Sequence, residues 1–95
     1  MPFTDEEIQT VWNKGRATTS NDPNVWRKDQ CDTWIIRNQY GNRDSNWGWE
    51  IYHINPDGGD NISNLRPLHW KNNLAKSEGR LGCVITAIGS ENVDI

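Results

Sequence analysis

Residues 40–76, YGNRDSNWGWEIYHINPDGGDNISNLRPLHWKNNLAK, carry the pattern that decides the fold. Residues 47–54 alternate in the manner of a strand, with large apolar side chains at every second position. Residues 55–60, NPDGGD, are dense in turn formers and must reverse the chain. Residues 62–66 can supply a short return strand, and Pro67 suits the first turn of a helix that reaches the end of the stretch. The pattern predicts an antiparallel hairpin followed by a helix.

An N-terminal helix is predicted over residues 4–14. Thr4 and Glu7 form a capping box, and the acidic residues after Thr4 complement the positive end of a helix. Apolar residues then share one face at helical spacing, and Gly15 ends the run. Residues 34–36 read as a short strand, and residues 81–88 as a strand or a tail packed on the core.

The length of the chain, 95 residues, suits one domain, and we expect residues 1–95 to form a single α+β unit. A domain of this size has a thin core, so most of the six tryptophans are expected in it. Stacking on nucleic-acid bases is the alternative role for any one of them. The sequence has no apolar run of about 18 residues, so no membrane segment is expected.

Cys31 and Cys83 are the two cysteines of the chain. The acidic N-terminus lacks the basic and apolar regions of a secretory signal, and this favours a cytoplasmic address. A reducing compartment would keep both cysteines as thiols, which is what we expect, although the sequence also allows a bridge between them.

The net charge of −3 is unevenly distributed. All ten basic residues lie in residues 14–80, together with eight of the thirteen acidic ones, so this region carries +2. The remaining acids lie near the two ends. This pattern permits a nucleic-acid partner but does not demand one.

Residues throughout the 40–76 stretch match a known arrangement, and they are Gly48-Trp49-Glu50-Ile51, His53-Ile54, Pro56, Gly58-Gly59, Asp60, Asn64-Leu65, Leu68, Trp70, Asn73 and Lys76. On these residues the chain resembles the HNH endonuclease family, whose ββα-metal (His-Me finger) motif is a hairpin followed by a helix. Residues 26–43 are also similar to what precedes the motif in small stand-alone members. Elsewhere the resemblance is thin.

The resemblance implies a site that hydrolyses DNA phosphodiester bonds with one divalent metal ion of the Mg²⁺, Mn²⁺ or Ni²⁺ class. His53 would be the general base, a role that suits histidine because its unperturbed pKa of about 6.5 lies near operating pH. Asn64 would brace the hairpin and orient the His53 ring. Asn73 would offer its amide oxygen to the ion, which would act as a Lewis acid and stabilise the leaving group.

Tyr52 departs from the family pattern, in which the residue before the base is an aspartate, or a histidine in some toxin members, and ligates the metal. A phenol, with a pKa near 10, is a poor ligand for Mg²⁺ at neutral pH. Glu50, on the same strand face, would have to span roughly 6–7 Å of strand rise to replace it. Asp57 and Asp60 are other conceivable substitutes. We therefore expect weak or absent metal-dependent activity.

Two further sets of residues, in and around this motif, concern zinc binding and phosphate binding. Zinc-stabilised relatives carry paired cysteines where this chain has His69 and Asn72, so no structural zinc is expected and His69 reads as an ordinary helix position. Basic residues around the motif could contact backbone phosphates, or could be solvated surface charges: Arg37, Arg43, Arg66, Lys71 and Lys76.

Two functions therefore stay open. One is an endonuclease acting on DNA, and the other is a catalytically inactive module that binds nucleic acid or a protein partner on the same scaffold. The residues around His53 could also be no more than the polar residues of a hairpin and helix.

Overall fold

The computed structural model describes residues 3–95 and has a mixed α+β architecture. Within these residues the strands form three two-stranded antiparallel sheets, β1–β2, β3–β4 and β5–β6. The elements in chain order are α1 (Asp5–Trp12), β1 (Trp26–Lys28), β2 (Trp34–Ile36), η1 (Arg37–Gln39), β3 (Trp49–His53), η2 (Ile62–Asn64), β4 (Leu65–His69), α2 (Trp70–Ser77), β5 (Ile85–Ile88) and β6 (Glu91–Asp94).

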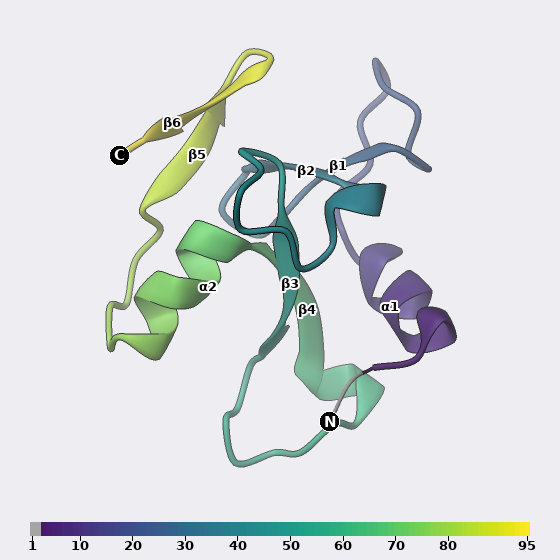
Figure 1. Ribbon diagram of the computed structural model, residues 1–95, viewed down its shortest axis with the longest axis vertical. Helices are drawn as coiled ribbons and strands as arrows, with labels where there is room; N and C mark the ends of the chain where they lie inside the picture. The colour runs from purple at the N-terminus through teal and green to yellow at the C-terminus, as the bar shows by residue number, and fades with distance from the viewer. Residues whose placement is uncertain (1–2) are drawn as a thin grey trace.

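The β3–β4 hairpin lies between the two helices, with α1 on one side and α2 on the other (Figure 1). Its two faces differ because successive side chains of a strand point in opposite directions. Trp49 belongs to the face toward α1, where its ring centroid lies 5.3 Å from that of Trp12. Glu50, the next residue, accepts a hydrogen bond from Asn73 of α2. The predicted order of a hairpin followed by a helix is confirmed.

Pro67 lies inside β4, so the predicted start of the helix at this residue is wrong. The backbone N–H of Ile54 donates to the Asn64 carbonyl, and hydrogen-bonded pairs recur at every second residue of an antiparallel ladder. Ile51, three residues from Ile54, therefore faces Pro67 at a pair that exchanges no hydrogen bonds. The missing N–H of proline costs the ladder nothing there, and α2 begins instead at Trp70.

The capping box at the start of α1 is confirmed. Thr4 Oγ1 accepts the Glu7 N–H at 3.1 Å, and Glu7 Oε1 accepts the Thr4 N–H at 2.9 Å. The helix ends at Trp12, two residues earlier than predicted. Its buried face joins residues from β2, β3 and β4 in the main core: Ile8, Val11, Trp12, Ile35, Trp49, Ile51 and Leu65.

The tryptophans divide between the core and the surface. Trp12 and Trp49 are fully buried and Trp34 nearly so, as the size of the domain led us to expect. Trp26, Trp47 and Trp70 are half-buried.

The strand boundaries differ from the predicted ones in three places. The strand predicted over residues 47–54 covers Trp49–His53, and the return strand begins only at Leu65, after the η2 turn. The β-branched run of residues 81–88 forms a strand over Ile85–Ile88. It pairs with β6, a strand that was not predicted.

Cys31 and Cys83 form a disulfide, so the expectation of two free thiols is wrong. The fold brings their Cα atoms to 5.8 Å, within bridging distance. The bond joins the loop after β1 to the segment between α2 and β5. The cytoplasmic address loses the support that free thiols would have given it, because disulfides persist in oxidising compartments.

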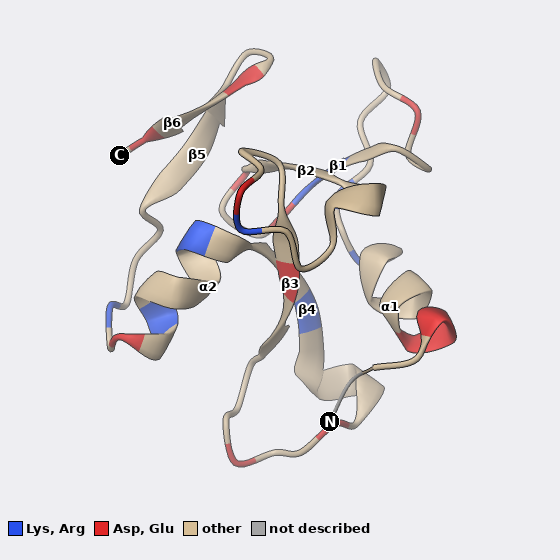
Figure 2. Ribbon diagram, viewed as in Figure 1, with Lys and Arg blue, Asp and Glu red and all other residues tan. Residues whose placement is uncertain are grey.

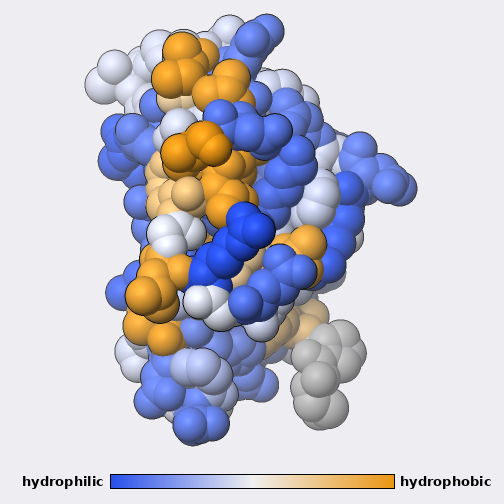
Figure 3. Space-filling view, turned by 90° about the vertical axis from the view of Figure 1, so that its left-hand side faces the viewer, coloured by the Kyte–Doolittle hydropathy of each residue, from blue (hydrophilic) through white to orange (hydrophobic). Residues whose placement is uncertain are grey.

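Charged and apolar residues are distributed unevenly over the surface. Acidic residues mark the start of α1 and the β6 strand, while lysines lie along α2 (Figure 2). Apolar patches are visible on the face that carries α2 and the β5–β6 hairpin (Figure 3). The most exposed large hydrophobic residues are Leu81, Ile88 and Ile95. Neither helix in residues 3–95 has the length and apolar character that a membrane crossing needs.

Candidate functional site

A pocket of about 280 Å³ lies between the end of β3 and α2. Four residues singled out in the sequence line it: Tyr52, His53, Asn73 and Lys76. The remaining lining comes from Ile51, Pro56 and Ser77. The fold therefore brings the predicted base and the predicted metal ligand to one surface cavity.

His53 is held by an aspartate from the loop between β3 and β4. Its Nε2 lies 2.7 Å from Asp60 Oδ1, and the His53 side chain is 34% exposed. A neutral ring that donates its Nε2–H to the carboxylate keeps the lone pair on Nδ1, where it can accept a proton. Sequence reasoning considered Asp60 only as a substitute metal ligand, and missed its role as the partner of His53.

Asn64 braces the loop between the strands. Its Oδ1 accepts the Asn55 N–H at 2.9 Å, and its Nδ2 donates to the carbonyls of Asn55 and Gly59 at 2.9 and 3.0 Å. The bracing role implied by the resemblance is present. The Asn64 amide is bonded to backbone groups of the loop, and the ring of His53 is contacted by Asp60, so the predicted orientation of His53 by Asn64 stays a prediction.

The two glycines of this loop are required by the same arrangement. A Cβ at Gly58 would lie 2.8 Å from Asn64 Nδ2, and Gly59 has a φ of +72°, a conformation that side chains disfavour. The Gly58-Gly59 pair thus lets the chain close around the asparagine amide.

Asn73 is oriented by Glu50. Its Nδ2 donates to Glu50 Oε1 at 2.9 Å, and because a carboxylate only accepts, the amide nitrogen must face Glu50 and the amide oxygen must point elsewhere. Arg43 binds the same carboxylate with two hydrogen bonds, Nε to Oε2 at 2.7 Å and a terminal nitrogen to Oε1 at 2.9 Å. Glu50 therefore orients the Asn73 side chain and does not compete with it as a metal ligand.

The carboxyl group of Glu50 stays ionised in this arrangement. Burial raises the pKa of Glu50, but the hydrogen bonds from Arg43 and Asn73 and the positive charge of Arg43 outweigh burial and hold the pKa below its usual value.

The donors at this pocket fit a resident divalent cation poorly. The Glu50 carboxylate is already bound by Arg43 and Asn73, and Lys76 places its ammonium 5.6 Å from the centroid of the Tyr52 ring, adding positive charge. Among residues 3–95 no group of three or more His, Cys, Asp or Glu side chains is placed to hold a metal ion. Asn73 offers an amide oxygen that Glu50 does not occupy, and the lining of the pocket, within the described part of the chain, contains no carboxylate, whereas Mg²⁺ sites use one or two carboxylates.

The predicted phosphate-contacting residues are dispersed. Lys76 lines the pocket, and Arg66 on β4 pairs in register with Tyr52 on β3. Arg37 instead donates its Nε–H to Gln9 of α1 at 2.9 Å, and Lys71 lies 3.8 Å from Asp94. Arg43 is engaged with Glu50, as described above.

His69 and Asn72 belong to a buried polar cluster behind the pocket. His69 Nδ1 accepts the Lys71 N–H at 3.1 Å, so its Nε2 carries the proton that it donates to the Asn46 carbonyl at 2.8 Å. Burial lowers the pKa of His69, which favours this neutral form. His69 is thus the N-cap of α2.

Asn72 makes five hydrogen bonds inside the molecule. Its Nδ2 donates to Asp29 Oδ2, Thr33 Oγ1 and the Ile85 carbonyl, and its Oδ1 accepts the N–H groups of Val84 and Ile85. These contacts join the β1–β2 loop, α2 and β5.

Comparison of the chain with protein-family models, with curated proteins and with solved structures gave no match.

Proposed function

We propose that this chain is an HNH-type endonuclease domain that acts on DNA phosphodiester bonds, with hydrolysis impaired by Tyr52. The observation that carries the proposal is the pocket between β3 and α2, where His53, fixed by Asp60, and Asn73, fixed by Glu50, meet at one cavity. Both side chains are held by a carboxylate that sets the orientation of their polar atoms.

In this proposal His53 takes a proton from water at Nδ1 as the water oxygen bonds to phosphorus. The bond between phosphorus and the leaving oxygen breaks, and that oxygen takes a proton from a solvent water. Asp60 keeps the ring in the required tautomer and stabilises the imidazolium that forms, as a carboxylate does in other histidine-based sites. Lys76 contributes positive charge toward the phosphate, and the Asn73 amide oxygen is left unoccupied by Glu50, which accepts from the amide nitrogen.

In the family that the chain resembles, one divalent ion of the Mg²⁺, Mn²⁺ or Ni²⁺ class supplies Lewis acidity. The described residues that line the pocket include no carboxylate that would hold such an ion. This absence is the physical reason for expecting weak hydrolysis.

A second function is favoured by one specific observation. Lys76, whose ammonium lies 5.6 Å from the centroid of the Tyr52 ring, gives the pocket a positive group where the family has a metal ligand. Such a pocket can bind a phosphate without cleaving it, so a catalytically inactive module that binds nucleic acid or a protein partner is the alternative.

Nicking of supercoiled plasmid with Mg²⁺, Mn²⁺ or Ni²⁺ tests both functions. The proteins compared are the chain as given, Tyr52→Asp, His53→Ala and the double variant, with Tyr52→Asn as the matched control that lacks only the carboxylate charge. We expect Tyr52→Asp, but not Tyr52→Asn, to raise the nicking rate. Replacing His53 in the Tyr52→Asp background should lower that rate by about 10²–10⁴-fold.

The outcomes separate the two functions. Nicking by the chain as given, abolished by His53→Ala, supports an active nuclease in which another group replaces the lost carboxylate. Nicking that appears only with Tyr52→Asp supports a disabled nuclease whose present role is binding. If no variant cleaves under any metal, the nuclease proposal is wrong.

A further inference from the structure

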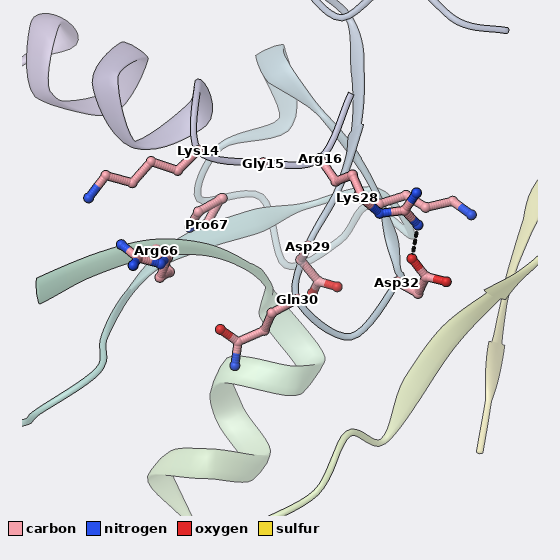
Figure 4. Close-up of a pocket in the computed structure, with 9 residues that line it drawn as sticks. All are labelled: Lys14, Gly15, Arg16, Lys28, Asp29, Gln30, Asp32, Arg66 and Pro67. Atoms are coloured by element: carbon pink, nitrogen blue, oxygen red, sulfur yellow. Dashed lines mark hydrogen bonds and ion pairs between the residues drawn. The ribbon is translucent and has the colours of Figure 1, made fainter. Parts of the chain in front are cut away.

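A second cavity, of about 310 Å³, lies beside β4, where the chain leaving α1 and the loop after β1 approach it (Figure 4). Its charged lining comes from three separate segments: Lys14 and Arg16 after α1, Lys28, Asp29 and Asp32 around the end of β1, and Arg66 on β4. Four cations against two carboxylates leave two positive charges without compensation at this cavity.

The two acids of this cavity already have partners. Asp29 is 4% exposed, and its carboxylate accepts the backbone N–H groups of Cys31, Thr33 and His69 as well as the Asn72 amide. Asp32 pairs with Arg16, and both side chains are 58% exposed. Neither acid lies in an ion pair with Lys14, Lys28 or Arg66 in residues 3–95.

The three remaining cations are held by neutral groups. Lys14 Nζ donates to the carbonyls of Ile62 and Leu65, and an Arg66 terminal nitrogen donates to the Leu65 carbonyl at 3.0 Å. Lys28 Nζ lies 4.7 Å from the centroid of the Trp34 ring. Carbonyls and an aromatic face fix these ammonium and guanidinium groups without neutralising them.

We propose that this cavity is a phosphate-binding site, separate from the His53 pocket, that takes a backbone phosphate of bound DNA. Compact anions with several acceptor oxygens match the ammonium of Lys14 and the guanidinium of Arg66, whose side chains extend to the same side in Figure 4, whereas Lys28 extends to the opposite side. Arg66 on β4 pairs in register with Tyr52 on β3, so the proposed phosphate site borders the hairpin that carries the His53 pocket. The assignment of DNA as the source of the phosphate rests on the proposed function, whereas the anion site itself does not.

The electrostatics of Lys14 agree with an anion site. Burial and the positive charge of Arg66 lower the pKa of Lys14. An anion between Lys14 and Arg66 would relieve this repulsion, so its binding would be favoured by the charges already present.

The test measures the binding of a short fluorescent DNA duplex by anisotropy from about 50 to about 200 mM salt. The variants are Lys14→Gln and Arg66→Gln, and the matched control is Arg80→Gln, which removes one charge from an exposed residue outside the cavity. Thermal melts check that each variant is folded. We expect each cavity variant to weaken binding several-fold and to reduce the slope of log affinity against log salt by roughly 0.9, with no such change for Arg80→Gln.

A second arm uses tripolyphosphate as the probe, with the amide NMR signals of Gly15 and Gln30, two residues of the cavity lining, as reporters. Shifts of these signals that Lys14→Gln abolishes support the anion site even if the chain binds no DNA, in which case the proposed function fails and a free phosphate compound is the ligand. DNA binding that is equal in the cavity variants and in Arg80→Gln, with no response to tripolyphosphate, would overturn this site and leave the proposed function standing.

Discussion

Asn72 and Asn73 are neighbours on α2, yet they serve two different regions of the molecule. Asn72 is fully buried and makes five hydrogen bonds that join three segments. Asn73 is half-buried, donates one hydrogen bond to Glu50, and lines the pocket that contains His53. The same residue type thus builds the fold at one position and the candidate site at the next.

This difference separates what the fold needs from what the chemistry needs. The buried cluster of Asp29, Thr33, His69 and Asn72 fixes α2 against the β1–β2 loop and β5. The pocket residues Tyr52 and Asn73 are only half-buried, so they can change without opening the core. A tyrosine at the position where the family that the chain resembles has a metal ligand is therefore compatible with an intact hairpin and helix.

The largest effect is expected from Asn72→Ala. This change leaves the Asp29 carboxylate, the Thr33 hydroxyl and the backbone groups of β5 short of partners in the interior, and an unsatisfied buried group costs about 1–3 kcal/mol. We expect the free energy of unfolding to fall by about 3–5 kcal/mol, measured by urea denaturation with tryptophan fluorescence.

Asn73→Ala is the matched control for that measurement. It removes one hydrogen bond at a half-exposed position, and should cost less than about 1.5 kcal/mol of unfolding free energy. Equal losses for the two alanine variants would show that the buried cluster does not hold the fold in the way described here.

The disulfide acts on the same segments as Asn72, and its loss should have the next largest effect. Cys31 lies between Asp29 and Thr33, and Cys83 directly precedes Val84, whose N–H binds Asn72. The bond joins two residues that lie 52 positions apart in the sequence. Replacing both cysteines by serine should lower the free energy of unfolding by about 2–4 kcal/mol through the entropy of the unfolded chain.

Chemical denaturation with and without reductant checks this prediction. Reductant should reproduce the effect of the double serine variant in the original chain and have no effect on that variant. Stability that does not respond to either treatment would show that the bond is not formed in solution.

The parts of the fold that were predicted correctly from the sequence are those that local sequence patterns specify. The capping box of Thr4 and Glu7, the alternation around Trp49 and the turn residues 55–60 each specify structure within a few positions. The buried cluster has no such signal, because Asp29 and Asn72 lie 43 residues apart and meet only when the chain is folded. The same holds for the bond between Cys31 and Cys83.

At the candidate site, sequence reasoning identified the residues but not their partners. His53, Asn64 and Asn73 were found from the resemblance, and the pocket unites two of them while Asn64 braces the loop. The Asp60 contact was missed because it depends on the path of a turn-rich loop, where spacing carries little information. Arg43 was read as a phosphate contact, but its geometry commits it to Glu50.

The smallest predicted effect concerns Glu50, which links the two regions by orienting Asn73. Because its pKa is lowered in the folded chain, its contribution to stability is present above the usual value of about 4.5 and is lost as the pH falls through the folded value. At neutral pH, Glu50→Gln should lower the free energy of unfolding by about 1 kcal/mol, a figure discounted because Arg43 is half exposed. Urea denaturation at several pH values should show this difference shrinking below about pH 4.5.

The exposed Glu78→Gln is the matched control and should show no such trend. A difference for Glu50→Gln that is constant with pH would mean that the carboxylate charge does not hold Asn73, and that the order of the site comes from the buried cluster alone.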